Sequence, residues 1–204
     1  MLIAIDGPAG AGKSTVARAL AAHLGFGYLD SGAMYRCVGL LSLRSPQADP
    51  AALAAGARIE LHAGWVSLDG EDVTGAIRSG EVSAAASAVA ADPQVRTALV
   101  EKQREILADG DWVCEGRDIG TVVAPDADVK VFLTADEAER ARRRAGELDV
   151  AVAQVADELA ARDRRDAARE HSPLRAAPDA AVIDCTALDV DEVVARIAAL
   201  AGRA

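Results

Sequence analysis

The feature that most constrains this chain of 204 residues is a glycine-rich loop between an apolar run and an amphipathic segment. Residues 2–5 are continuously apolar, as expected of a strand buried on both faces, and residues 7–14 read G-P-A-G-A-G-K-S. After the loop, Val16, Leu20 and Leu24 recur at helical spacing until Gly25 ends the pattern. A strand, a G-x-x-x-x-G-K-S loop and a helix in this order predict a phosphate-binding P-loop.

The chemistry expected of this loop follows from its residues. Glycines let several backbone N–H groups converge on phosphate oxygens, and the N-terminus of the following helix favours an anion. We expect Lys13 to bridge the β- and γ-phosphates of a nucleotide and the Ser14 hydroxyl to bind Mg²⁺. A loop that only turns the chain is the structural alternative, which the flanking strand and helix disfavour. The expected nucleotide-binding residues are Gly7, Pro8, Ala9, Gly10, Ala11, Gly12, Lys13, Ser14 and Thr15.

The rest of the sequence indicates the fold in which this loop lies. Apolar runs like the first recur at residues 27–29, 112–114, 129–133 and 181–183, and helical segments separate them. This alternation predicts a single α/β domain with a five-stranded parallel sheet as its core.

Two segments break the alternation. Residues 58–73 predict a small antiparallel insert with a hairpin turn at Asp69-Gly70, and residues 136–170 predict an arginine-rich helical segment. Thr134 and Glu137 resemble a capping box that opens the second segment. Neither segment has enough large apolar residues for a core of its own. We therefore expect both to be lobes mounted on the sheet, where hinged closure would occur.

A P-loop alone does not separate kinases from GTPases, motor ATPases or nucleotide-binding regulators, but composition removes several classes. The chain has no asparagine, which excludes an Asn-Lys-x-Asp guanine-reading motif, and its net charge of −10 argues against a nucleic-acid binder. Cys37, Cys114 and Cys185 are widely separated and have no histidine at ligand spacing, which indicates free thiols in a reducing cytosol. The mostly apolar stretch 82–91 is too short to cross a bilayer. Asp6 interrupts the short N-terminal apolar run, so we do not expect this run to be a signal peptide. We expect a cytoplasmic monomer without a membrane or nucleic-acid partner.

Polar residues follow two of the predicted strands, at the sheet edge where α/β proteins bind ligands. After the second strand, Ser31 could hydrogen-bond a ligand and Arg36 could bind a phosphate; alternatively, Asp30 or Ser31 caps a helix and Arg36 is a surface charge. Residues 114–121 read C-E-G-R-D-I-G-T and end another strand.

Within that second stretch, Arg117 and Asp118 are adjacent, so their side chains point in different directions. Such a pair suits a ligand that carries both a phosphate and a donor-bearing base. Glu115 stands where P-loop proteins often hold an acid that orders magnesium-bound water; alternatively, it is a charge at a strand terminus.

Nine of the 19 arginines lie between residues 136 and 175. Arg162, Asp166 and Arg169 are spaced i, i+4, i+7, which predicts one helix face, and Arg140, Arg142, Arg143 and Arg144 form a second cluster. Both could be solvated ion-pair ladders. As parts of a closing lid, they could instead place cationic groups on a transferring phosphoryl group and exclude water.

With these motifs together, the chain resembles the bacterial cytidylate kinases, a family of P-loop nucleoside monophosphate kinases. The specific motifs are S-G-A-x-Y-R at residues 31–36 and G-R-D-x-G-T-V-V at 116–123; further matches cover residues 80–82, 87–96, 162–169 and 184–186. The resemblance implies direct transfer of the ATP γ-phosphoryl group to CMP or dCMP, assisted by Mg²⁺. Another small-molecule P-loop kinase, such as a UMP/CMP kinase, is the alternative; a non-catalytic ATP-binding regulator and an arginine-rich nucleic-acid module are less favoured.

The resemblance also implies an organisation and a role for individual residues. The core would comprise residues 1–30, 100–135 and 171–204, the CMP-binding lobe 31–99 and the lid 136–170. Ser87, Arg96 and Asp118 resemble the cytosine readers, with Ser31 in the same pocket. Arg36, Arg117 and Arg169 resemble the residues that bind the CMP phosphate in this family. Arg162 and Asp166 resemble residues near the sugar. The implied catalytic residues are Lys13, Arg117, Asp118, Arg162 and Arg169, and the implied metal contacts are Ser14 and, through water, Glu115.

Overall fold

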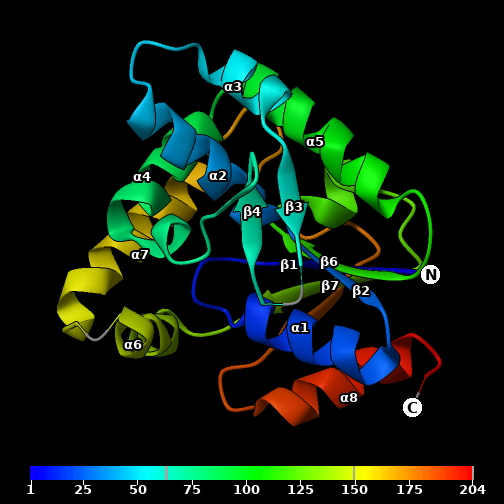
Figure 1. Ribbon diagram of the computed structural model, residues 1–204. Helices are drawn as coiled ribbons and strands as arrows, with labels where there is room; N and C mark the ends of the chain where they lie inside the picture. The colour runs from blue at the N-terminus through cyan, green and yellow to red at the C-terminus, as the bar shows by residue number, and fades with distance from the viewer. Residues whose placement is uncertain (63, 149, 204) are drawn as a thin grey trace. The chain divides into compact units, whose positions relative to one another are not determined.

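The computed structural model describes residues 1–62, 64–148 and 150–203. The chain divides into two compact units, one formed by Met1–Tyr28 with Asp109–Ala204 and the other by Leu29–Ala108. The first unit contains the predicted P-loop (Figure 1). The finer division into core, CMP-binding lobe and lid stays a prediction.

A five-stranded sheet forms the centre of the first unit. Its order is β2-β6-β1-β7-β8, and β1 pairs in parallel with β6 and β7, while β7 pairs in parallel with β8. The predicted five-stranded parallel sheet is therefore confirmed. The strands are β1 (Leu2–Asp6), β2 (Gly27–Asp30), β6 (Trp112–Gly116), β7 (Val129–Thr134) and β8 (Ala181–Asp184).

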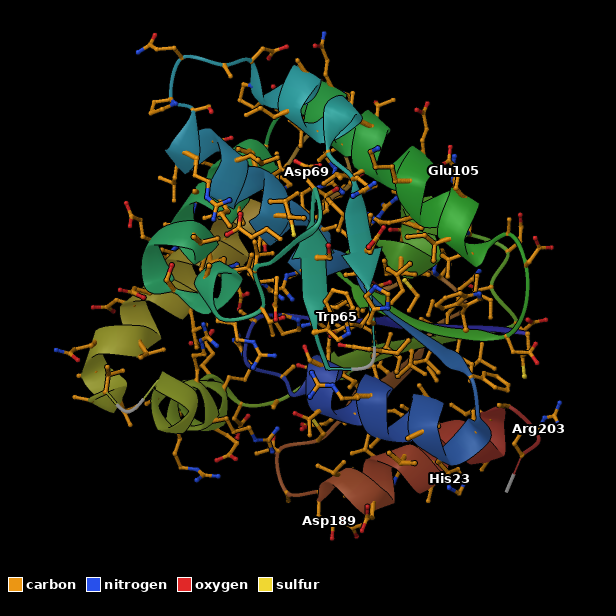
Figure 2. All side chains as sticks on the ribbon, in the orientation of Figure 1. His23, Trp65, Asp69, Glu105, Asp189 and Arg203 are labelled. Atoms are coloured by element: carbon orange, nitrogen blue, oxygen red, sulfur yellow. The ribbon has the colours of Figure 1, made fainter. Side chains whose placement is uncertain are left out.

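Two helices pack with this sheet to form its main apolar core. Helices α1 (Lys13–Leu24) and α8 (Val190–Leu200) lie side by side (Figure 1), and their apolar faces join the strand side chains in one buried cluster. Gly25 ends α1 in the left-handed conformation (φ 70°), and Asp189 opens α8 in a capping box with Glu192 (Asp189 is labelled in Figure 2). The cluster includes Ile3, Ile5, Val16, Leu20, Val113, Val131, Leu133, Val193 and Ile197.

The arginine-rich segment forms helices α6 (Glu137–Leu148) and α7 (Val152–Ala167), which pack against each other. The predicted capping box is wrong, because Thr134 is the last residue of β7 and α6 begins at Glu137 itself. Their apolar contacts are few and small, as expected: the buried cluster consists of Ala9, Ala141, Ala145, Val155 and Leu159.

The second unit is mostly helical and carries a three-stranded antiparallel sheet of order β3-β4-β5. Its elements are α2 (Ser31–Arg44), α3 (Pro50–Gly56), β3 (Ile59–Leu61), β4 (Val66–Leu68), β5 (Glu71–Asp72), the 3₁₀ turn η1 (Ala76–Arg78), α4 (Gly80–Val89) and α5 (Pro93–Leu107). Gly39 lets α2 approach α4, since a Cβ there would lie 2.7 Å from the Ala86 nitrogen.

The predicted insert is confirmed as this small sheet. Asp69 and Gly70 both have positive φ (53° and 89°), as a two-residue type I′ hairpin turn requires. The sheet and α2 share an apolar cluster that includes Cys37, Leu40, Leu68 and Ile77. The insert therefore packs on α2 rather than around a core of its own. At the β3–β4 connection, Trp65 (Figure 2) stacks on the His62 ring with centroids 3.9 Å apart.

Within the described ranges, no helix combines the length and apolar character needed to cross a membrane.

Candidate active site around the phosphate-binding loop

The loop after β1 has the backbone conformation that its glycines predict. Gly7, Gly10 and Gly12 have φ values of 152°, 73° and 85°, a region that side chains with a Cβ rarely adopt. A Cβ at Gly7 would lie 2.1 Å from the Leu133 carbonyl oxygen. Helix α1 begins directly after the loop, so its N-terminal N–H groups lie at the predicted phosphate position.

Lys13 is the buried cation of this loop. Its Nζ donates a hydrogen bond to the Pro8 carbonyl oxygen at 2.7 Å. The pKa of Lys13 is lowered to about 7, mainly by burial, then by the nearby positive charge of Arg117 and to a smaller extent by that of Arg162. Glu115 and Asp6 act in the opposite direction. A bound phosphate would supply the negative charge that favours the ammonium form.

The end of β6 carries three of the predicted residues. Glu115 is buried and accepts a hydrogen bond from the Tyr28 hydroxyl at 2.7 Å. Asp118 is also buried and precedes a five-residue π-helical turn, η2 (Ile119–Val123). Glu115 is therefore not simply a solvated charge at a strand terminus.

Asp6, which the sequence analysis did not select, holds this turn in place. Its two carboxylate oxygens accept the backbone N–H groups of Ile119 and Gly120, each at 2.8 Å. Burial raises the pKa of Asp6 to about 6, although these two hydrogen bonds oppose the rise. The charge that interrupts the apolar run of β1 was the available sequence signal for this role.

Asp166 brings two of the predicted arginines together. The Nε of Arg117 donates to Asp166 at 3.0 Å, and Arg169 donates to the other carboxylate oxygen. The Nη1 of Arg117 also donates to the Gly7 carbonyl oxygen at 2.6 Å, which ties the pair to the loop. Because Asp166 is only 1% exposed, the solvated-ladder interpretation is wrong for this cluster.

The expectation that Arg162, Asp166 and Arg169 share one helix face is also wrong in part. Helix α7 ends at Ala167, so Arg169 lies beyond it. Arg169 nevertheless pairs with Asp166, because the backbone leaves the helix within reach of that carboxylate.

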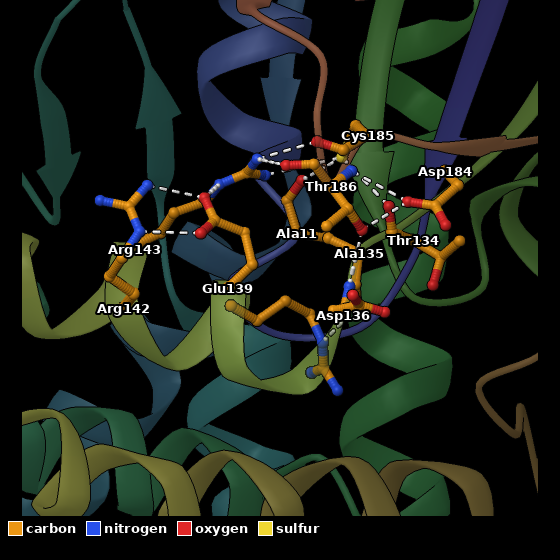
Figure 3. Close-up of polar contacts among 11 residues, drawn as sticks. Ala11, Thr134, Ala135, Asp136, Glu139, Arg142, Arg143, Asp184, Cys185 and Thr186 are labelled. Carbon is orange, nitrogen blue, oxygen red and sulfur yellow. Dashed lines mark hydrogen bonds and ion pairs between the residues drawn. The ribbon is translucent and has the colours of Figure 1, made fainter.

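The arginines of α6 have different environments. Arg142 is exposed and pairs with Glu139, which matches the solvated alternative. Arg143 pairs with the same glutamate, and its Nη2 donates to the carbonyl oxygen of Cys185 at 2.8 Å (Figure 3). Arg140 is buried and contacts the P-loop directly. Two of these arginines therefore anchor α6 to neighbouring loops, which sequence spacing alone did not predict.

In the second unit, the predicted residues at the start of α2 are built around Asp30. Its carboxylate accepts the Ala33 N–H at 2.8 Å and pairs with Arg36 at 2.9 Å. Asp30 therefore caps the helix, as one alternative expected, but it also orients Arg36. Ser31 is buried beside it.

The other predicted residues of this unit lie on α4 and α5. Ser87 is buried, and its hydroxyl has no hydrogen-bond partner among the described residues. The Arg96 guanidinium lies over the Tyr35 ring, 5.5 Å from its centroid. Gln103, which the sequence analysis missed, is 1% exposed, and neither atom of its amide has a partner in the described part of the chain.

The predicted site residues thus fall into two groups. The structure brings together the loop, Glu115, Arg117, Asp118, Arg162, Asp166 and Arg169 within the first unit. Ser31, Arg36, Ser87 and Arg96 all belong to the second unit.

The residues expected to contact Mg²⁺ fit a nucleotide-bound ion. Across residues 1–62, 64–148 and 150–203, no three metal-binding side chains of the His, Cys, Asp or Glu type cluster together. Magnesium in kinases is usually held by one or two protein groups together with substrate phosphates, so no larger cluster is needed. Ser14 at the start of α1 and the buried carboxylate of Glu115 provide groups of the required type.

A parallel sheet with a P-loop after its central strand, and arginines gathered around that loop, defines a P-loop kinase. Among solved structures, the shikimate kinase of Bacteroides thetaiotaomicron has a similar fold, with a TM-score of 0.51 and 13% identity over 99% of this chain and 98% of that one.

Sequence comparison identifies the family to which the chain belongs, which the similarity of fold alone does not. The family model of cytidylate kinase matches residues 3–203, and the chain belongs to this family. Cytidylate kinase of Solibacter usitatus is 51% identical over 95% of this chain and 88% of its own length. That of Pelotomaculum thermopropionicum is 51% identical over 97% and 94%.

Proposed function

We propose that this protein transfers the γ-phosphoryl group of ATP to CMP, giving CDP and ADP. The observation that carries the proposal is the Asp166 carboxylate, which holds Arg117 and Arg169 beside the P-loop. The P-loop would bind the phosphates of the donor nucleotide. The two oriented guanidinium groups would bind the phosphate of the acceptor. Family membership supports CMP as that acceptor.

The chemistry requires positioning and charge stabilisation more than acid–base catalysis. The acceptor phosphate is already an anion at neutral pH, so no strong general base is needed. The loop N–H groups and Lys13 bind the donor phosphates, while Arg117, Arg162 and Arg169 offset negative charge on the equatorial oxygens. Bound Mg²⁺, held by Ser14 and through water by Glu115, would neutralise donor phosphate charge. In-line transfer then forms the new P–O bond as the bond to ADP breaks, without a covalent enzyme intermediate.

Base recognition is proposed one residue at a time, from the family pattern. Asp118 would accept a hydrogen bond from the cytosine amino group, and Ser87 and Arg96 would contact the ring. Ser31 and Arg36 would bind the acceptor, Arg36 through its phosphate and Ser31 within its pocket. Asp166 and Arg162 would lie near the sugar. The family resemblance adds dCMP as a second acceptor. The proposed setting is a cytoplasmic monomer, and the net charge of −10 supports the absence of a nucleic-acid partner.

An acceptor panel tests the proposal. ADP formation from ATP and Mg²⁺ is measured with CMP, dCMP, UMP, AMP or shikimate, and without an acceptor. We expect rapid ADP formation with CMP and dCMP and little without an acceptor. Preference for another acceptor would identify a different small-molecule kinase, and ATP binding without acceptor-dependent ADP would identify a non-catalytic regulator.

A further inference from the structure

The peptide group that joins Pro8 and Ala9 lies between the loop lysine and the arginine-rich helices. Its carbonyl oxygen accepts the hydrogen bond of Lys13 Nζ at 2.7 Å, and its N–H donates to Asp163 Oδ1 on α7 at 3.0 Å. The chain has no cis peptide bonds in its described part, so these two groups point in opposite directions from one planar unit. The orientation of this peptide therefore influences where the Lys13 ammonium group lies.

Asp163 is held for this contact by Arg140. The Arg140 guanidinium pairs with the second carboxylate oxygen of Asp163 and donates to the Ala9 carbonyl oxygen at 3.0 Å. Its Nε donates to the Ala135 carbonyl oxygen at 3.1 Å, which fixes the side chain at the start of α6. Asp163 and Arg140 thus engage both peptide groups that flank Ala9. Both side chains are largely buried, at 17% and 9% exposure, so water weakens the contact less than it would at the surface.

Apolar packing supports the same contact. The Ala9 methyl group is buried in the cluster of α6 and α7 side chains that contains Ala141, Val155 and Leu159. A Cβ at Gly10 would lie 2.8 Å from the Arg140 carbonyl oxygen, so the backbone of α6 lies directly against the loop. The first half of the P-loop is therefore part of the small core of the two helices.

We propose that Asp163 is a positioning residue for Lys13, acting through the Pro8–Ala9 peptide. A carboxylate that accepts the N–H polarises the peptide and makes its carbonyl a better acceptor for the lysine ammonium. Arg140 neutralises the carboxylate, so that a negative charge can stand beside a loop that binds phosphates. The proposal rests on the proposed function only in that the loop binds ATP.

Replacement of Asp163 by Asn disturbs this arrangement whichever way the amide is turned. If its oxygen faces the Ala9 N–H, its NH₂ faces the donors of Arg140; if its oxygen faces Arg140, its NH₂ faces the Ala9 N–H. One of the two contacts is lost in either case, although the side chain keeps its size. Asp157→Asn is the matched control, because Asp157 is an exposed carboxylate on the same helix.

The test is a double-mutant cycle on ATP binding. The dissociation constant for ATP with Mg²⁺ is measured without any acceptor for the wild type, Asp163→Asn, Lys13→Ala and the double variant, each checked for a cooperative thermal transition. We expect Asp163→Asn to weaken ATP binding about tenfold or more in the wild type. In the Lys13→Ala background we expect it to have little further effect, because the residue through which it acts is gone.

Equal weakening in both backgrounds, or none in the wild type, would overturn the proposal. If Asp163→Asn does not fold, Arg140→Lys replaces it in the same cycle with the same expectation, since it keeps the charge but loses the forked contacts to Ala9 and Ala135. The cycle uses no CMP. A chain that binds ATP without phosphorylating CMP would contradict the proposed function and leave this inference standing.

Discussion

Two buried or partly buried carboxylates near the P-loop each hold arginines in ion pairs, whereas the second unit contains a helix serine and a helix glutamine that are buried without a hydrogen-bond partner among the described residues. Asp166 holds two arginines, and Asp163 holds Arg140. In contrast, the Ser87 hydroxyl and the Gln103 amide have no partner within the described residues. Paired arginines suit the binding of phosphate groups, which every nucleotide carries, because the ion pairs fix the cations in place before the ligand binds. Buried polar groups without a partner, such as the Ser87 hydroxyl, can still form a hydrogen bond with a specific ligand group.

The largest expected effect comes from removing the loop lysine. Lys13→Ala should lower turnover by about 10²-fold or more, because the cation at the transferring phosphoryl group is lost. Steady-state ADP formation with saturating ATP and CMP measures this. Lys102→Ala, on α5 of the second unit, is the control and should retain turnover. Turnover of Lys13→Ala near the wild-type value would remove the P-loop from the mechanism.

Breaking the paired arrangement at Asp166 should have the next largest effect. Asp166→Asn removes the charge that holds Arg117 and Arg169, so we expect KM for CMP to rise by about 30-fold, with a smaller change for ATP. The free energy of unfolding should fall by about 3 kcal/mol, since two partly buried guanidinium groups lose their buried counter-charge. Kinetics and denaturant unfolding are compared with Asp157→Asn. Equal losses for the two nucleotides would contradict an acceptor-side role.

A smaller effect is expected in the second unit. Ser87→Ala should raise KM for CMP by roughly three- to tenfold, the equivalent of one neutral hydrogen bond, and leave KM for ATP unchanged. Ser83→Ala on the same helix is the control, because the Ser83 hydroxyl already donates to the Ser79 carbonyl oxygen. An unchanged KM for CMP in the Ser87 variant would exclude this hydroxyl from base recognition.

The smallest change concerns stability rather than catalysis. Gln103→Leu removes a buried amide without partners and keeps the side-chain volume similar, so the free energy of unfolding should rise by about 1 kcal/mol. Denaturant unfolding measures the difference, with the exposed Gln94→Leu on the same helix as the control. A clear loss of stability would show that the Gln103 amide has a stabilising partner.

The sequence predicted those parts that depend on contiguous patterns. The P-loop, the five strands and the Asp69-Gly70 turn each arise from neighbouring residues, and all are present, although β8 is not fully buried because its Val182 is exposed. The capping box at Thr134 failed because β7 continues through that residue. The prediction that Arg162, Asp166 and Arg169 share one helix face is wrong in part, because nothing in their spacing indicates that α7 ends at Ala167.

The missed residues depend on contacts between distant segments. Asp6 binds a turn 113 residues away, and Arg140 pairs with Asp163 on a different helix. A polar residue such as Gln103 on a helix normally indicates a solvated face, so its burial had no local signal. Residue spacing alone predicts which groups lie near a strand end, but not which partners orient them.

The most direct test is to follow the phosphoryl group itself. The protein is incubated with Mg²⁺, CMP and ATP labelled at the γ-phosphate, and the label is located in the nucleotides and in the protein. We expect the label in the β-phosphate of CDP, in a one-to-one ratio with ADP, and none bound to the protein. Label in free phosphate without CDP, or a labelled protein intermediate that forms before CDP, would contradict direct transfer to CMP.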